Sequence, residues 1–138
     1  MNIFENYLSK INKVILDNKG ILNLENLDLL KNVNLEIPPE KFKFDLSTNI
    51  SLVLAKANKN NPNKLANEIK DLFLKKINHF EKIEVAEPGF LNIKLSKEAL
   101  ISNINDIINS KNSYGSKKTK KIFNIEFVSA NPTGPMHV

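Results

Sequence analysis

The chain has 138 residues, 41% of them hydrophobic, which is enough for one ordinary domain and at most part of a second. It has no cysteine and only two histidines, so the sequence excludes disulfides and offers no ligand set for a structural metal. The formal charge of +5 rests on lysine without arginine, and because no segment resembles a membrane span or a signal peptide, we expect a cytoplasmic protein without membrane contact.

The first third of the chain combines a helical pattern with two strand patterns. Apolar residues recur every three or four positions over residues 2–19 and Gly20 follows, which predicts an amphipathic helix with a glycine stop. The apolar spacing then changes to two over residues 33–37 and 42–46, on either side of Pro38-Pro39. This alternation predicts two half-buried strands joined by a proline turn.

Two helices and a hairpin follow. Ser47 or Thr48 is expected to cap a helix that runs to about residue 59, and Asn61-Pro62 has the residue types that begin a second one. Beyond it, alternating residues on both sides of Glu87-Pro88-Gly89 predict a β-hairpin with one wet face.

The last predicted element of this unit is a helix over about residues 97–109. We expect it to bury five large aliphatic side chains: Leu100, Ile101, Ile104, Ile107 and Ile108. Residues 1–112 thus predict an α+β domain, with a small antiparallel sheet of about four strands and helices packed on one face. Residues 113–121 read as a linker.

The second hairpin strand carries a candidate binding surface. If Leu91, Ile93 and Leu95 face the core, strand geometry sends Phe90, Asn92 and Lys94 to the opposite side. An aromatic ring, an amide and a cation in a row can stack a base, bond its edge and hold a phosphate. Alternatively, Phe90 packs under a loop and the other two are ordinary surface residues.

Residues 122–138 predict the start of a different domain. A nearly continuous apolar run, typical of a parallel strand covered on both faces, leads into a Pro/Gly loop that delivers His137. Polar residues at the carboxyl end of such a strand are where open α/β sheets bind ligands, and here they are Glu126, Ser129 and Asn131. A tight turn that satisfies its own backbone is the alternative. We interpret the chain as the amino-terminal piece of a larger enzyme.

The segment EFVSANPTGPMHV at 126–138 closely resembles the opening of the class I, Rossmann-type catalytic domain of arginyl-tRNA synthetases. Weaker similarities to the same family's amino-terminal domain occur upstream, in the expected order: DLSTN at 45–49, VAEPGFLNIKL at 85–95 and the pair Tyr114-Gly115. The resemblance covers the chain from about Lys31 to its end.

This resemblance implies an enzyme that activates arginine with Mg-ATP and transfers it to the terminal adenosine of its tRNA. In the family, the amino-terminal domain reads a nucleotide of the tRNA D-loop through an aromatic and an amide, which fall on Phe90 and Asn92. Matching positions imply that Glu126, Ser129 and Asn131 hold the arginine and that His137 contacts ATP phosphates as a catalytic residue. Glu87 occupies a position where relatives carry Asn or Gly. Gly134 occupies a position where some relatives carry Lys.

Three functional interpretations therefore stand. The first is the tRNA-binding part of an arginyl-tRNA synthetase, monomeric and inactive by itself. The second is a free-standing nucleic-acid or protein interaction module. The third is a small nucleotidylyltransferase with a similar histidine turn, although that turn usually lies near the amino terminus and more than a hundred residues precede it here.

Overall fold

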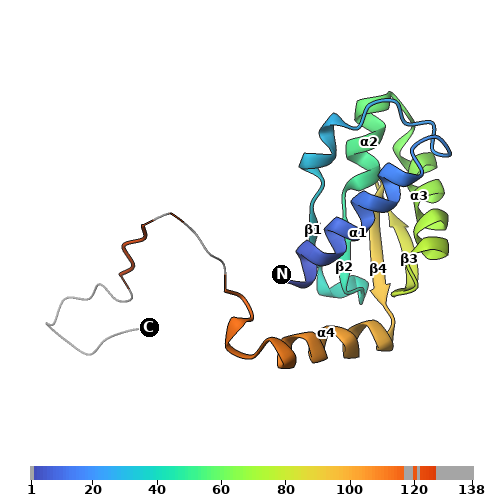
Figure 1. Ribbon diagram of the computed structural model, residues 1–138. Coiled ribbons are helices and arrows are strands. Elements are labelled where there is room, and N and C mark those ends of the chain that lie inside the picture. Colours follow the sequence, from blue (N-terminus) through green and yellow to red (C-terminus); the bar gives the residue numbers. More distant parts are fainter. Residues whose placement is uncertain (1, 117–119, 121, 127–138) are drawn as a thin grey trace, which may run out of the picture.

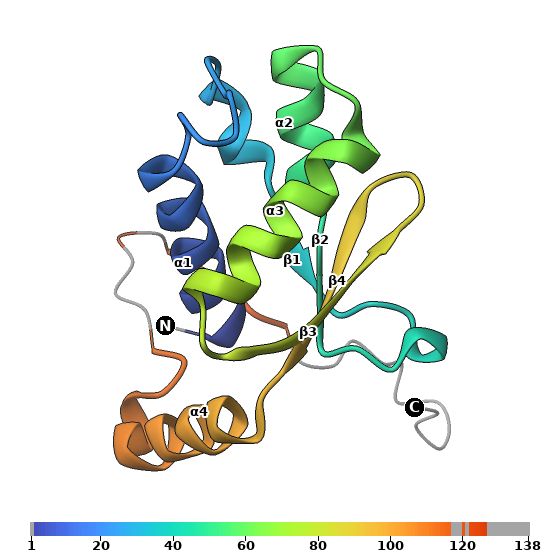
Figure 2. The ribbon, with the colours of Figure 1, turned by 90° about the vertical axis from the view of Figure 1, so that its right-hand side faces the viewer.

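The structure, a computed structural model, describes residues 2–116, 120 and 122–126. The fold is α+β, as predicted: a four-stranded antiparallel sheet in the order β1-β2-β4-β3 carries helices α1, α2 and α3 on one face, while α4 lies beyond one end of the sheet (Figures 1 and 2). The elements are α1 (Ile3–Asp17), β1 (Leu35–Glu36), β2 (Leu46–Thr48), α2 (Ile50–Asn58), α3 (Pro62–Lys76), β3 (Phe80–Ala86), β4 (Phe90–Leu95) and α4 (Lys97–Ser110), with short 3-10 turns η1 (Asp28–Asn32), η2 (Glu40–Phe42) and η3 (Lys111–Ser113).

The core lies between the sheet and the helical layer. In the sheet, Ile93 of β4 is paired with Leu46 of β2 on one side and with Ile83 of β3 on the other, and all three are buried. The stripe of α1 that meets this layer consists of Tyr7, Ile11 and Ile15, each fully buried. The helical period read from the sequence therefore selected the correct face of α1.

Three of the helices begin with a side-chain cap. Asn2, Asn61 and Ser96 each accept a hydrogen bond from the backbone N–H three residues ahead, at 2.8, 3.0 and 3.2 Å. Such caps satisfy one of the amides that a helix leaves unpaired at its start. At α3 the cap is followed by Pro62 in the first turn, as the sequence predicted.

The predicted cap of α2 is wrong. Ser47 and Thr48 are strand residues of β2, buried between neighbouring strands, and α2 begins at Ile50. Asn49, the residue before α2, instead accepts the Asn34 N–H at 2.8 Å. Serine and threonine occur both as helix caps and in short strands. The residue types alone therefore did not distinguish a cap from a strand.

The predicted strands around the proline pair are shorter than expected. β1 has only two residues, and the 3-10 turn η2 occupies residues 40–42, where the second strand was expected to begin. Lys43 then adopts a left-handed conformation with φ of 53°, which delays the extended backbone until β2.

The helix predicted over about residues 97–109 is present as α4, but the prediction of which side chains it buries is wrong. Its buried residue is Ala99, whereas the five aliphatic side chains expected in the core are 38–64% exposed. The reason is that α1, α2 and α3 already cover the helix-bearing face of the sheet, so α4 contacts the domain mainly through its first turns (Figure 1).

The strand predicted from residue 122 onward is not formed where the structure describes it. Residues 122–126 have no regular secondary structure, and the side chain of Ile122 is 100% exposed. A parallel strand needs at least one paired neighbour and cover on both faces, and no described strand pairs with this segment. Residues 127–138 lie outside the described residues.

Candidate nucleic-acid interface

One face of the sheet has no described α-helix over it (Figure 2). Three side chains of β4 face the helices and are buried: Leu91, Ile93 and Leu95. The alternate residues Phe90, Asn92 and Lys94 therefore belong to the opposite face. By register, Ser47 of β2 and Glu84 of β3 flank Asn92 there. We call the face formed by these five residues the open face.

Phe90 and Asn92 differ in accessibility. Phe90 is half-buried at the beginning of β4, next to the hairpin turn. The expectation of an exposed amide is wrong for Asn92, which is only 4% exposed. Ser47 of β2 and Glu84 of β3 lie directly beside it by register, at the usual cross-strand spacing of about 5 Å. Of these two residues, Phe90 is therefore the one that a ligand can reach more readily.

Lys94 is held by a carboxylate. Its Nζ lies 3.0 Å from Oδ1 of Asp45, and the other oxygen of Asp45 accepts the Leu95 N–H at 2.8 Å. Asp45 thus joins the chain before β2 to the end of β4. A phosphate that approaches Lys94 must compete with Asp45 for the same ammonium group.

The turn that precedes Phe90 is fixed from two helices. The hydroxyl of Ser51, at the start of α2, donates to the carbonyl of Gly89. Asn63 of α3 donates to both carboxylate oxygens of Glu87 at 3.2 Å. Gly89 itself has φ of +143°, a conformation that side-chain-bearing residues rarely adopt. These contacts position the start of β4, and with it the ring of Phe90.

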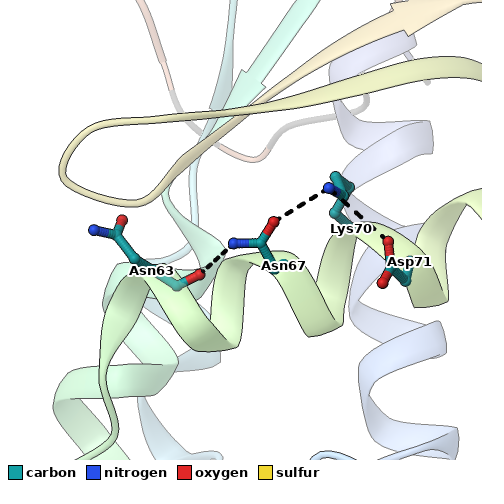
Figure 3. Close-up of polar contacts among 4 residues, drawn as sticks. All are labelled: Asn63, Asn67, Lys70 and Asp71. Carbon is teal, nitrogen blue, oxygen red and sulfur yellow. Dashed lines mark hydrogen bonds and ion pairs between the residues drawn. The ribbon is translucent and has the colours of Figure 1, made fainter.

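Polar contacts continue along the outer side of α3 (Figure 3). The Asn67 amide donates to the backbone carbonyl of Asn63 at 2.9 Å, and Lys70 donates to Oδ1 of Asn67 at 3.2 Å. Asp71 lies 4.0 Å from the same ammonium group. Lys70 is therefore occupied by its own helix and offers little free charge to a ligand.

A second polar cluster joins three elements at the other end of the sheet. The Tyr7 hydroxyl lies 2.9 Å from Nδ1 of His79 and 3.4 Å from the Asn103 amide nitrogen, which can donate to it. Burial raises the pKa of Tyr7, while the bond from Asn103 lowers it to a lesser extent. The pKa of His79 is lowered, first by burial and then by the charge of Lys10. The sequence gave no sign of this contact, because Tyr7 and His79 lie 72 residues apart.

The His79 environment predicts a pH dependence of stability. Because the folded pKa lies below the ordinary value of about 6.5, the unfolded chain takes up the proton first as the pH falls. The contribution of His79 is complete above pH ~6.5 and decreases as the pH falls toward the folded pKa. Urea unfolding between pH 5 and 8 should therefore show a smaller acid-side loss of stability for His79→Gln than for the parent. Identical pH profiles would contradict this prediction.

The remaining predicted site residues lie at the end of the chain. Glu126 is described and exposed, whereas Ser129, Asn131 and His137 lie outside the described residues. Within the described part of the chain, no group of three or more His, Asp or Glu residues could hold a metal ion. None of the helices described in the structure combines the length and apolar character needed to cross a membrane.

Comparisons with known proteins identify relatives of this chain. Residues 3–95 match the family model described as the arginyl tRNA synthetase N terminal domain. The whole chain is 44% identical to arginine–tRNA ligases of Pelagibacter ubique and Bartonella bacilliformis, and 97% of it is 43% identical to that of Mesoplasma florum. The chain spans about a quarter of the length of these relatives, 24%, 24% and 23% respectively.

Proposed function

This chain belongs to the arginyl-tRNA synthetase N-terminal domain family, and on this basis we propose that it is the tRNA-binding part of an arginine–tRNA ligase. The complete enzyme would activate arginine with Mg-ATP and transfer it to the 3'-terminal adenosine of its tRNA. The chain described here would contribute the contact with the corner of the tRNA, including a D-loop nucleotide.

The observation that carries the tRNA proposal is the position of Phe90. A half-buried aromatic ring stands at the rim of the open face, on a strand whose start is fixed by Ser51 and Asn63. An unpaired base stacks on such a ring with little dependence on its identity, and stacking contributes about 1–3 kcal/mol per base. Asn92 would bond the base edge only through the small part of its amide that remains exposed. Lys94 would exchange Asp45 for a phosphate.

The residues proposed for the chemical steps are those in the final segment. Glu126 is the natural partner for the guanidinium of arginine, because a carboxylate accepts paired, charge-assisted hydrogen bonds from it. Ser129 and Asn131 would assist in holding arginine, and His137 would donate to the ATP phosphates. Since the chain matches only a quarter of its relatives, we expect no arginine-dependent ATP–pyrophosphate exchange from residues 1–138.

A binding measurement tests the tRNA proposal. Phe90→Ala should raise the Kd for an arginine tRNA transcript about tenfold, within the 1–3 kcal/mol range of a lost stacking contact, while Phe90→Tyr should retain affinity. Phe42→Ala is a matched control, because this ring is also accessible, at 40% exposed, but lies in η2 and is not one of the five residues of the open face. A Kd unchanged by Phe90→Ala in a variant that melts normally would remove Phe90 from the interface. Equal affinity for unrelated tRNAs would favour a general nucleic-acid module.

A further inference from the structure

A hollow of about 330 Å³ lies between α1 and the end of α3, away from the open face. Cationic and apolar side chains line it together: Lys10, Lys13, Val14, Lys76, Ile77 and His79. Asn78 completes the lining, so that three ammonium groups and an imidazole surround this hollow without a carboxylate among its lining residues.

The three lysines of the hollow are not engaged by carboxylates, a property they share with most lysines of the described chain; what sets them apart is that they line one hollow together. The ion pairs among the described residues involve Lys70, Lys82 and Lys94, each with a neighbouring carboxylate. Figure 3 shows how Lys70 is engaged by residues of its own helix. Lys10, Lys13 and Lys76 form no ion pair with any described residue. Their charge is therefore available to a ligand.

Two of the lining groups have fixed positions. Nζ of Lys10 lies 5.0 Å from the centre of the Tyr7 ring, a distance at which the ring face attracts a cation. Nδ1 of His79 is occupied by the Tyr7 hydroxyl, which leaves Nε2 for a ligand. The charge of Lys10 also contributes to the lowered pKa of His79. The hollow therefore combines positive charge with two lining groups that both contact Tyr7.

We propose that this basic hollow binds backbone phosphates of RNA, as a second contact region for the tRNA that meets the open face. The inference rests on the proposed function, since it names where the same partner would be held by charge. Lysine binds phosphate as a mobile point charge, and neutralising backbone phosphates supplies most of the sequence-independent affinity of nucleic-acid binders. The alternative role of Lys76, to offset the dipole at the end of α3, requires neither Lys10 nor Lys13.

The test is the salt dependence of tRNA binding by residues 1–138. We expect the triple variant Lys10→Gln/Lys13→Gln/Lys76→Gln to bind an arginine tRNA transcript about tenfold more weakly at low salt. Its slope of log K against log salt should be shallower by about 2 to 3, because each lost phosphate contact removes about 0.7–0.9. The control Lys31→Gln/Lys41→Gln/Lys56→Gln loses the same charge from exposed positions outside the hollow. Equal effects of the two triple variants would overturn the proposal.

A second readout observes the hollow directly. When a phosphate enters, its negative charge should raise the pKa of His79, measured from the imidazole proton shifts with and without tRNA and assigned with His79→Gln. The triple variant should lose this rise. If Phe90→Ala weakens binding but the His79 pKa does not move, the hollow is not a contact and the proposed function stands. If the parent binds no tRNA at all, the proposed function itself fails.

Discussion

Replacing Ile11 by alanine should lower the free energy of unfolding by about 2–5 kcal/mol, whereas the same replacement at Ile104 should change it by no more than about 0.5 kcal/mol. Both are isoleucines on the apolar stripe of a helix. Ile11 is fully buried in α1, and its truncation leaves a cavity against the sheet. Ile104 is 55% exposed on α4, so truncation removes few contacts there.

Urea or guanidinium unfolding, followed by circular dichroism, measures both changes in one two-state experiment. The pair is internally controlled, because both residues are isoleucines within an α-helix and both lose the same atoms, while only their burial differs. A large loss of stability for Ile104→Ala would mean that the apolar stripe of α4 is buried in the isolated chain. The difference between the two variants therefore tests the arrangement of α4 itself.

The contrast between α1 and α4 also defines what could be predicted from the sequence. Both helices have a regular apolar stripe, and the period of that stripe identified each helix. Periodicity does not say, however, how many helices can pack on one face of a sheet. Three helices already occupy one face of this four-stranded sheet, so the stripe of α4 remains outside the core although its pattern resembles that of α1.

The candidate interface was predictable to a similar extent. Alternation along residues 90–95 correctly identified Leu91, Ile93 and Leu95 of β4 as core residues. It could not show that Asn92 is only 4% exposed, because the burial of a strand residue depends on segments that are distant in the sequence, such as β2 and β3 beside it. It likewise could not pair Lys94 with Asp45, 49 residues earlier. Long-range neighbours, rather than local pattern, determine which polar groups a ligand can reach.

The hairpin turn was predicted from its residue types, and its contacts make it a sensitive position. Gly89→Ala should destabilise the domain by about 1–3 kcal/mol, since an alanine would be held at a φ of +143°. Its Cβ would also lie 3.2 Å from Cβ of Pro62 and 3.3 Å from Cδ2 of Leu52. Either Pro62 and Leu52 yield by a few tenths of an ångström, or the turn moves away from α2 and α3, which would weaken the bond from Ser51.

Gly20→Ala is the matched control. No atom lies within 4 Å of the position of its added Cβ, and its φ is not positive, so the change should be neutral or stabilise by up to about 1 kcal/mol. Thermal melts compare the two variants, and tRNA binding well below both melting temperatures separates stability from function. Because Phe90 follows Gly89 directly, we expect Gly89→Ala to weaken tRNA binding and Gly20→Ala to leave it unchanged. A destabilised Gly89→Ala variant with full affinity would show that the turn supports the fold without positioning the ring.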